Sequence, residues 1–310
     1  MLNISNSIDM ESKDYKSVFF FGYSDFSPPP KKYRGRKNPR YCRFCRQFEG
    51  SITFKNEAHV IPQGFGNRYL ISLEQCDQCN QKCGLAEFEL MKMFDPIRGL
   101  AVSRKADQSY IKFKTKLGSF IKSGISEDTR TISIVKGDPD LVDLSENDGF
   151  LKLKATVHDI NTFAAAKALG MMAWHVIPET KLDYLEHFRQ WFTTESVFEF
   201  KASMFLQQIL RVKDTPTSLT LFQRHSMNKD AAPFVVGFTY EAFALTMPIP
   251  DATFRVEQPK IPITNKLGKD NIQAGEAVNI QAISSDRDGK VSFSLVIVLG
   301  PGNKVEEIYN

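Results

Sequence analysis

Four of the five cysteines of this chain fall into two closely spaced pairs, and this pattern limits what the N-terminal part can fold into. The pairs are Cys42-x-x-Cys45 and Cys76-x-x-Cys79, and Cys83, the spare, is expected to be a packed or surface thiol. A disulfide framework would spread its cysteines along the chain and would need an oxidising compartment. Two C-x-x-C pairs joined by a loop have the spacing that brings four thiolates around one tetrahedral ion. The pattern predicts a structural Zn²⁺ site, with a redox pair as the alternative.

A run of basic residues leads directly into the first cysteine pair. Eight lysines and arginines, and no acidic residue, lie between Lys31 and Arg46, in a chain whose net charge is only +4. Because neutralised phosphates release counterions, a nucleic acid is the natural partner of such a run, and a solvated flexible arm is the alternative. The residues expected to contact nucleic acid are Lys37, Arg40, Arg43, Arg46 and, in the following loop, Arg68.

The 30 residues between the two cysteine pairs carry the polar side chains suited to chemistry. Partial alternation over 52–62 predicts a short strand that contains His59 and ends at Pro62. A turn-rich loop with Asn67 follows, and Asn80 comes directly after the second pair. The sequence then predicts a helix over 81–94. Its expected apolar stripe consists of Leu85, Phe88, Leu90, Met91 and Phe94.

With these residues in this order, the segment 38–100, about a fifth of the chain, resembles the HNH endonucleases. The matching segments are Cys42-x-x-Cys45, Ala58-His59-Val60-Ile61-Pro62, Gly66-Asn67 and Cys76-Asp77-Gln78-Cys79-Asn80. The resemblance implies a ββα-metal, treble-clef-like domain in which a histidine lies on the first strand and an asparagine or histidine lies on the helix. It is closest to the zinc-knuckled HNH subgroup.

Hydrolysis of a phosphodiester needs an activated nucleophile, a charge clamp on the phosphate and help for the leaving oxygen. His59 suits the role of general base because imidazole titrates near neutral pH. A divalent ion, Mg²⁺ or Mn²⁺, would stabilise the developing negative charge. By resemblance, Asn80 would help to hold that ion, and Asn67 would orient His59 or its loop through a side-chain hydrogen bond.

One position departs from the pattern of many HNH enzymes, which have a metal-binding acid directly before the base histidine. Here that position is Ala58. Glu57 would share the side of His59 on a regular strand, and is one replacement. Glu87 or Glu89, reaching in from the helix, is the other. For each glutamate the alternative is a solvated surface charge.

The remaining sequence predicts a second, larger α+β domain. The expected strands are 110–116, 131–136, 150–157, 218–223, 233–247 and 291–299, and the expected helices are 162–176, 179–192 and 196–212. We therefore expect an α+β protein with a basic, partly disordered leader (1–37), an HNH nuclease domain (38–104) and a recognition or regulatory domain (105–310). Its apolar runs are too short to span a bilayer and its N-terminus lacks the features of a signal peptide, so we expect a cytoplasmic protein without membrane contact.

Two functions fit the sequence. The first is a metal-dependent DNA endonuclease of bacterial defence or restriction type, gated or targeted by its C-terminal domain; HNH domains of this kind are often fused to domains that recognise a signal or a DNA feature. One site cuts one strand, so a double-strand break would require a homodimer or sequential nicks. The second is a non-catalytic zinc-stabilised module that binds nucleic acid. RNA as the substrate stays open, and no motif in 105–310 identifies a small-molecule or DNA-feature ligand.

Overall fold

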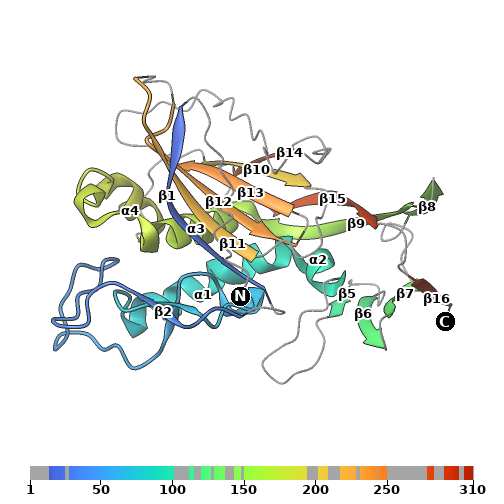
Figure 1. Ribbon diagram of the computed structural model, residues 1–310, viewed down its shortest axis with the longest axis horizontal. Coiled ribbons are helices and arrows are strands. Elements are labelled where there is room, and N and C mark those ends of the chain that lie inside the picture. The colour runs from blue at the N-terminus through green and yellow to red at the C-terminus, as the bar shows by residue number, and fades with distance from the viewer. Residues whose placement is uncertain are drawn as a thin grey trace.

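The chain folds as an α+β protein, as predicted, and Figure 1 shows its computed structural model. The described residues are 14–24, 28–100, 112–114, 120–126, 129–136, 143–147, 150–193, 202–208, 217–227, 231–241, 243–249, 278–282, 290–299 and 304–309. No helix within these ranges combines the length and the apolar character needed to cross a membrane.

The largest element is a six-stranded antiparallel sheet in the order β1-β11-β12-β13-β10-β14. Its strands are β1 (Tyr15–Tyr23), β11 (Thr217–Arg224), β12 (Phe234–Tyr240), β13 (Phe243–Ile249), β10 (Ala202–Gln208) and β14 (Val278–Ala282). The central strands β12 and β13 are buried along nearly their whole length. Such strands are continuously apolar because both of their faces are covered.

A buried helix, α3 (Thr162–Val176), covers one face of this sheet. Its N-terminus is capped by the Asn161 side chain, which accepts a hydrogen bond from the Ala164 backbone N–H at 2.9 Å. Nearly every residue of α3 is buried, because the helix lies between the sheet and α1 (Asp77–Met93). A helix that is apolar all round is suited to this central position.

Strand β2 (Lys32–Arg34), which precedes the first cysteine pair, forms a separate three-stranded sheet with two strands from the segment between the pairs. The order in this sheet is β2, β4 (Leu70–Ser72) and β3 (Ala58–His59). The other elements lie around this core. They are η1 (Gln63–Phe65), α2 (Asp95–Leu100), η2 (Glu179–Lys181), α4 (Glu186–Thr193), the sheet of β15 (Lys290–Leu299), β9 (Phe150–Asn161) and β8 (Asp143–Asn147), and the sheet of β16 (Lys304–Tyr309), β7 (Thr129–Lys136), β6 (Phe120–Ser126) and β5 (Lys112–Lys114).

The cysteine-containing segment and the large sheet share one hydrophobic cluster. Phe65, on the loop between β3 and β4, packs against Phe94, Phe238 and Tyr240 with ring centroids 4.9 to 5.5 Å apart. The preceding Gly64 has no room for a side chain, since a Cβ there would lie 1.9 Å from the Met91 sulfur. The two regions are therefore joined through their cores. The boundary near residue 104 stays a prediction.

Several expectations about secondary structure were wrong. The strand expected at 52–62 is limited to β3, the strand expected at 233–247 is divided into β12 and β13, and the helix expected at 179–192 is divided into η2 and α4. The expected leader contains β1, which pairs with β11 along its full length, so residues 15–23 belong to the main sheet. The helix expected at 196–212 is replaced over its described part by strand β10. Met204 and Leu206 are both buried there, which is the two-residue period of a strand.

The stripe expected on the helix after the second cysteine pair is only partly correct, since Leu90 and Phe94 are buried and Met91 packs against the core. Leu85 and Phe88 are 82% and 57% exposed, respectively. The buried face of α1 instead consists of Cys83, Ala86, Leu90 and Met93, which recur at helical spacing and include two residues of low apolar weight. Packing against α3 selects this face.

The C-terminal end of α3 carries a buried histidine that is held neutral. His175 is 4% exposed, and its Nδ1 has no hydrogen-bond partner within the described structure. Burial, with the charges of Arg43 and Arg34 nearby, lowers the pKa of His175 to about 3. Below about pH 6.5 the unfolded chain therefore binds a proton at His175, whereas in the folded chain this histidine stays neutral.

This difference makes folding sensitive to acid. Between pH 6.5 and pH 3 the unfolded state binds more protons than the folded state. The free energy of unfolding should therefore decrease as the pH is lowered through that window, by up to about 1.4 kcal/mol per pH unit. We expect His175→Leu to flatten this slope between pH 6.5 and 5 in urea titrations. The matched control is His187→Leu, at an exposed position of α4, which should keep the wild-type slope. Equal slopes in all three proteins would contradict the assignment.

Candidate active site and zinc centre

Four sulfur atoms converge between the two cysteine pairs. The Sγ atoms of Cys42, Cys45, Cys76 and Cys79 all lie within 4.8 Å of one another, and those of Cys45 and Cys76 are 3.9 Å apart. A tetrahedral zinc ion with Zn–S bonds of about 2.3 Å would space its sulfurs about 3.8 Å apart. All of the cysteines are free thiols, so no disulfide competes for these sulfurs. The arrangement is compatible with structural zinc.

Backbone amides surround the sulfurs as a thiolate site requires. The Cys76 N–H points at the Cys42 sulfur at 3.4 Å, and the Cys79 N–H points at the Cys76 sulfur at 3.5 Å. Hydrogen bonding, chiefly from the Cys79 thiol, lowers the pKa of Cys42 to about 5. Cys76 also caps the N-terminus of α1. The predicted spare, Cys83, is buried and accepts a hydrogen bond from the Gln75 amide at 3.1 Å, so it is a packed thiol outside the cluster.

Asp77, which lies between the two cysteines of the second pair, ties the zinc centre to the segment before β3. Its carboxylate accepts hydrogen bonds from the Thr53 hydroxyl (2.5 Å), the Lys55 N–H (3.0 Å) and the Asn56 N–H (2.8 Å). These bonds lower the pKa of Asp77 to about 2. Sequence reasoning missed this role. The available signal was an acidic residue in the first turn of a helix, where it complements the dipole.

His59 lies on β3, opposite Ile71 of β4, and is half-buried. The backbone carbonyl of Glu57 lies close enough to raise the pKa of the ring, although less strongly than burial lowers it. Burial is the largest cause that lowers the pKa of His59. The charges that act on it are those of Glu57, Lys31 and Arg68. The imidazole is thus neutral at neutral pH and close to cationic side chains.

Asn67 is completely buried and holds the loop that follows β3. Its amide donates to the carbonyls of Ile61 (2.8 Å) and Leu70 (3.1 Å), and its Oδ1 accepts from the N–H groups of Tyr69 and Leu70. All of these partners are backbone atoms of the β3–β4 connection. Of the two roles considered for Asn67, this placement matches orientation of the loop and not a bond to the His59 ring.

Asn80 lies in the first turn of α1 and is half-buried; α1 begins at Asp77, four residues before the predicted start. Glu89 has a structural task, since its carboxylate accepts the Asn161 N–H at 2.9 Å at the start of α3. Burial raises the pKa of Glu87 to about 7. Glu57 is exposed and pairs with Lys31 at 3.0 Å.

Within the part of the chain that the structure describes, the four cysteines are the one group of three or more His, Cys, Asp or Glu side chains close enough to share an ion. His59, Glu57 and Glu87 therefore do not form such a group. Any second metal ion near His59 would depend on fewer of these side chains and on water, as is usual for Mg²⁺.

The expected nucleic-acid contacts divide into two kinds. Arg43 is 5% exposed; it donates to the carbonyl oxygens of Trp174 and His175 at the end of α3, and its guanidinium pairs with Glu74 at 3.0 Å. The expectation that Arg43 contacts nucleic acid is therefore wrong, because a buried arginine that caps a helix cannot reach a phosphate.

Arg46 pairs with Asp183 and Glu186 at 3.1 and 2.7 Å, and Arg40 donates to the Phe54 carbonyl at 2.8 Å. Lys37 and Arg68 are exposed, and no acidic partner is assigned to either among the described side chains. Much of the basic run therefore stabilises the fold. Lys37 and Arg68 stay available for a polyanion.

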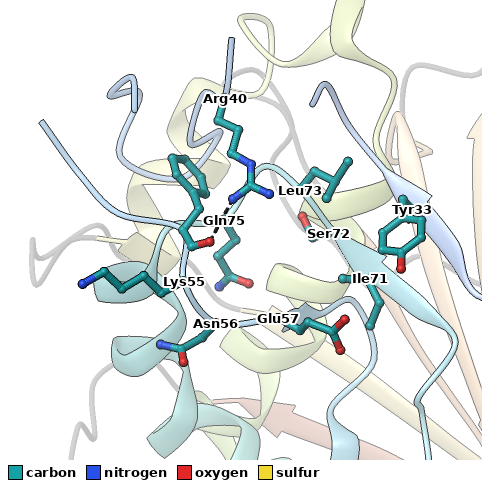
Figure 2. Close-up of a pocket in the computed structure, with 10 residues that line it drawn as sticks. Tyr33, Arg40, Lys55, Asn56, Glu57, Ile71, Ser72, Leu73 and Gln75 are labelled. Atoms are coloured by element: carbon teal, nitrogen blue, oxygen red, sulfur yellow. Dashed lines mark hydrogen bonds between the residues drawn. The ribbon is translucent and has the colours of Figure 1, made fainter. Parts of the chain in front are cut away.

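A small pocket of about 160 Å³ opens beside the sheet of β2, β4 and β3, with Tyr33 on one side and Gln75 on the other (Figure 2). Arg40 and Glu57 also line it. Glu57 connects this pocket to the surroundings of His59, because its charge acts on that ring.

The comparison with protein families agrees with this geometry. Residues 42–89 match the family model described as HNH endonuclease, and this segment contains both cysteine pairs, His59, Asn67 and Asn80. The chain thus contains an HNH endonuclease domain, as the sequence predicted, and such a domain implies a nucleic-acid substrate. Neither the curated proteins nor the solved structures yielded a match.

Loss of zinc should disturb α3 as well as the cysteine-containing segment. The Trp174 indole donates to the Arg43 carbonyl at 3.1 Å, and Arg43 caps α3 in return, so unfolding between the cysteines removes both bonds. We expect a strong chelator to increase hydrogen exchange at residues 40–80 and at the end of α3, and to shift tryptophan fluorescence. Trp174→Phe, which retains Trp191, should lose most of this fluorescence shift. Unchanged exchange in α3 alongside unfolding of residues 40–80 would contradict the coupling.

Removal of the Asp77 carboxylate should loosen the segment before β3. Asp77→Ala takes away three hydrogen bonds to a charged acceptor, and we expect a loss of about 1–3 kcal/mol of stability with faster exchange at residues 53–57. Gln78→Ala, at the exposed neighbouring position, is the control and should leave exchange unchanged. Similar exchange in both variants would show that Asp77 does not hold this segment.

Proposed function

We propose that this protein is a metal-dependent endonuclease that hydrolyses DNA phosphodiester bonds, with His59 as the general base. The observation that carries the proposal is the state of His59 within the segment that matches the HNH endonuclease family. Burial lowers its pKa, and His59 lies on β3 paired with Ile71 of β4. The free nitrogen of such a ring accepts a proton from water at neutral pH.

Asn80 and Glu57 would hold a divalent ion with a partly aqueous shell. The Asn80 amide and the Glu57 carboxylate offer the oxygen ligands that Mg²⁺ and Mn²⁺ prefer. Glu57 fits better than Glu87, because the raised pKa of Glu87 favours its protonated form near neutral pH. When bound, the ion would supply charge stabilisation to the scissile phosphate and to the leaving oxygen. His59 would hold the proton taken from water, and Asn67 would keep the loop behind it in place.

Positive charge around His59 supports a polyanionic substrate. Lys31 and Arg68 lie close enough to influence the pKa of the ring, and Arg68 is exposed. Lys37 adds a further exposed charge on the approach from β2. These contacts would be to phosphates, and phosphates position a strand without reading its sequence. DNA and RNA both fit this surface.

A non-catalytic nucleic-acid-binding module is the second candidate. It is favoured by one observation, that the described His, Cys, Asp and Glu side chains near His59 do not form a three-ligand group. A pure binding module would tolerate the loss of His59 without any functional change, which separates the two candidates experimentally.

We also propose that the region after residue 105 gates or targets the nuclease, in a bacterial defence or restriction system in the cytoplasm. The contacts of Arg43 and Phe65 support gating, since a shift of α3 or β12 would be felt in the cysteine-containing segment. A small molecule or a DNA feature would be the trigger. Double-strand cleavage would call for a homodimer or for sequential nicks.

The test is nicking of supercoiled plasmid with Mg²⁺ or Mn²⁺. We expect His59→Ala to lower the nicking rate by about 10²- to 10⁴-fold, the usual contribution of a general base. His187→Ala, on α4, is the matched control and should nick at the wild-type rate. Equal nicking by wild type and His59→Ala would exclude His59 as the base. If zinc-loaded wild type binds DNA without nicking it under either metal, the binding module is the better description.

A further inference from the structure

The pocket of Figure 2 lies on the same small sheet as His59. Tyr33 of β2 pairs with Ile71 of β4, and Ile71 pairs with His59 of β3, so the three residues form one row across the sheet. Paired residues project from the same face, and two strand spacings separate Tyr33 from His59 by about 10 Å. This is the length of about three steps along a stacked nucleic-acid strand. A strand held with a phosphate at His59 would thus bring a nearby base to the pocket.

The lining offers an aromatic surface and fixed hydrogen-bond acceptors. The Tyr33 ring is 55% exposed, which leaves a face free for stacking. Gln75 is 3% exposed, and its Nε2 is bound to the Cys83 sulfur, so the amide cannot rotate freely. No donor to its Oε1 is assigned among the described residues, and Figure 2 shows the amide pointing into the pocket. The Glu57 carboxylate is a second acceptor.

The size and the charges of the pocket narrow the choice of ligand. Its volume of about 160 Å³ is close to that of a cavity, about 150 Å³, that holds a single benzene ring. Lys55 is exposed at its edge and can meet the phosphate of the same nucleotide. The Oε1 of Gln75 and the Glu57 carboxylate, which pairs with Lys31, accept hydrogen bonds, whereas the Arg40 guanidinium in the same lining donates them. This mixture favours a single ring with both an exocyclic amino group and a ring carbonyl, as in cytosine, whereas the O4 of thymine would face the acceptors without a donor.

We propose that this pocket holds one unstacked cytosine of the strand on which the HNH domain acts, within a few nucleotides of the scissile phosphate. Tyr33 stacks on the base, and the Oε1 of Gln75 accepts a hydrogen bond from its amino group. The choice of ligand rests on the proposed nuclease function, whereas the binding itself does not require cleavage. The pocket would give the enzyme a preference for sites with cytosine at one position.

The test measures binding without cleavage, in His59→Ala protein, by fluorescence anisotropy of labelled single strands in which each base in turn is replaced by an abasic site. Stacking of one base is worth about tenfold in affinity. We expect one cytosine position at which the abasic site weakens binding about tenfold, and at which a thymine also weakens it. The double variant that carries Tyr33→Ala in addition to His59→Ala should bind the intact strand about tenfold more weakly, and the abasic site should not weaken its binding further. Tyr33→Phe, which keeps the ring, is the matched control and should behave like the parent.

The loss of affinity caused by the abasic site and the loss caused by Tyr33→Ala must be non-additive, because both remove the same stacking contact. Tyr33 is exposed, so its replacement should not unfold the protein, and circular dichroism checks this. Additive losses would overturn the proposed cytosine site, and so would the absence of a sensitive position on both DNA and RNA of the same sequence. Non-additive losses on either DNA or RNA would support the site. Non-additive losses without any plasmid nicking by the wild type would support the cytosine site and contradict the proposed nuclease function. Nicking that depends on His59, without non-additive losses, would do the reverse.

Discussion

The convergence of four cysteine sulfurs is the constraint on which the N-terminal half depends. It joins two chain segments that are 30 residues apart and leaves everything between them as a short, closed excursion. Asp77 then holds the outgoing part of that excursion at residues 53–56, and Asn67 holds its turn. β3, only two residues long, would not be stable by itself. Its histidine is positioned by these two fixed ends.

The HNH segment is joined to the rest of the chain through polar contacts as well as through its core. Arg43, between two cysteines of the four-sulfur cluster, satisfies carbonyl groups at the C-terminal end of α3 that have no partner within the helix. Arg189 of α4 donates to the Phe44 carbonyl in the same turn. A buried arginine with partners on every side contributes specificity of docking as much as stability. The orientation of the HNH segment on α3 is therefore well defined.

The sequence was sufficient for the features that depend on local pattern. The convergence of the cysteine pairs and the helix at 162–176 follow from spacing and composition, and both lie where they were expected. The misassignments have a common physical origin, which is long-range packing. Basic residues around the first cysteine pair resembled a free polycation, but acidic residues distant in sequence pair with two of them. Glu179 of η2 pairs with Arg36, and Asp183 and Glu186 pair with Arg46. The stripe on α1 was placed by hydrophobicity alone, whereas α3 selects a face that includes Ala86 and Cys83. No local rule indicates these partners.

The pairing of β1 with β11 has a consequence for synthesis of the chain. Tyr23 lies opposite Thr217, so about 200 residues must be added before the first strand meets its neighbour. At about 5–20 residues per second, β1 waits roughly 10–40 s on the ribosome with its aromatic side chains uncovered. From the time that the HNH segment emerges until β12 is made, it lacks the aromatic partners that β12 gives to Phe65. A nascent chain would thus carry His59 on an unsupported connection between β3 and β4, and this region would reach its final packing only after β12 has been made.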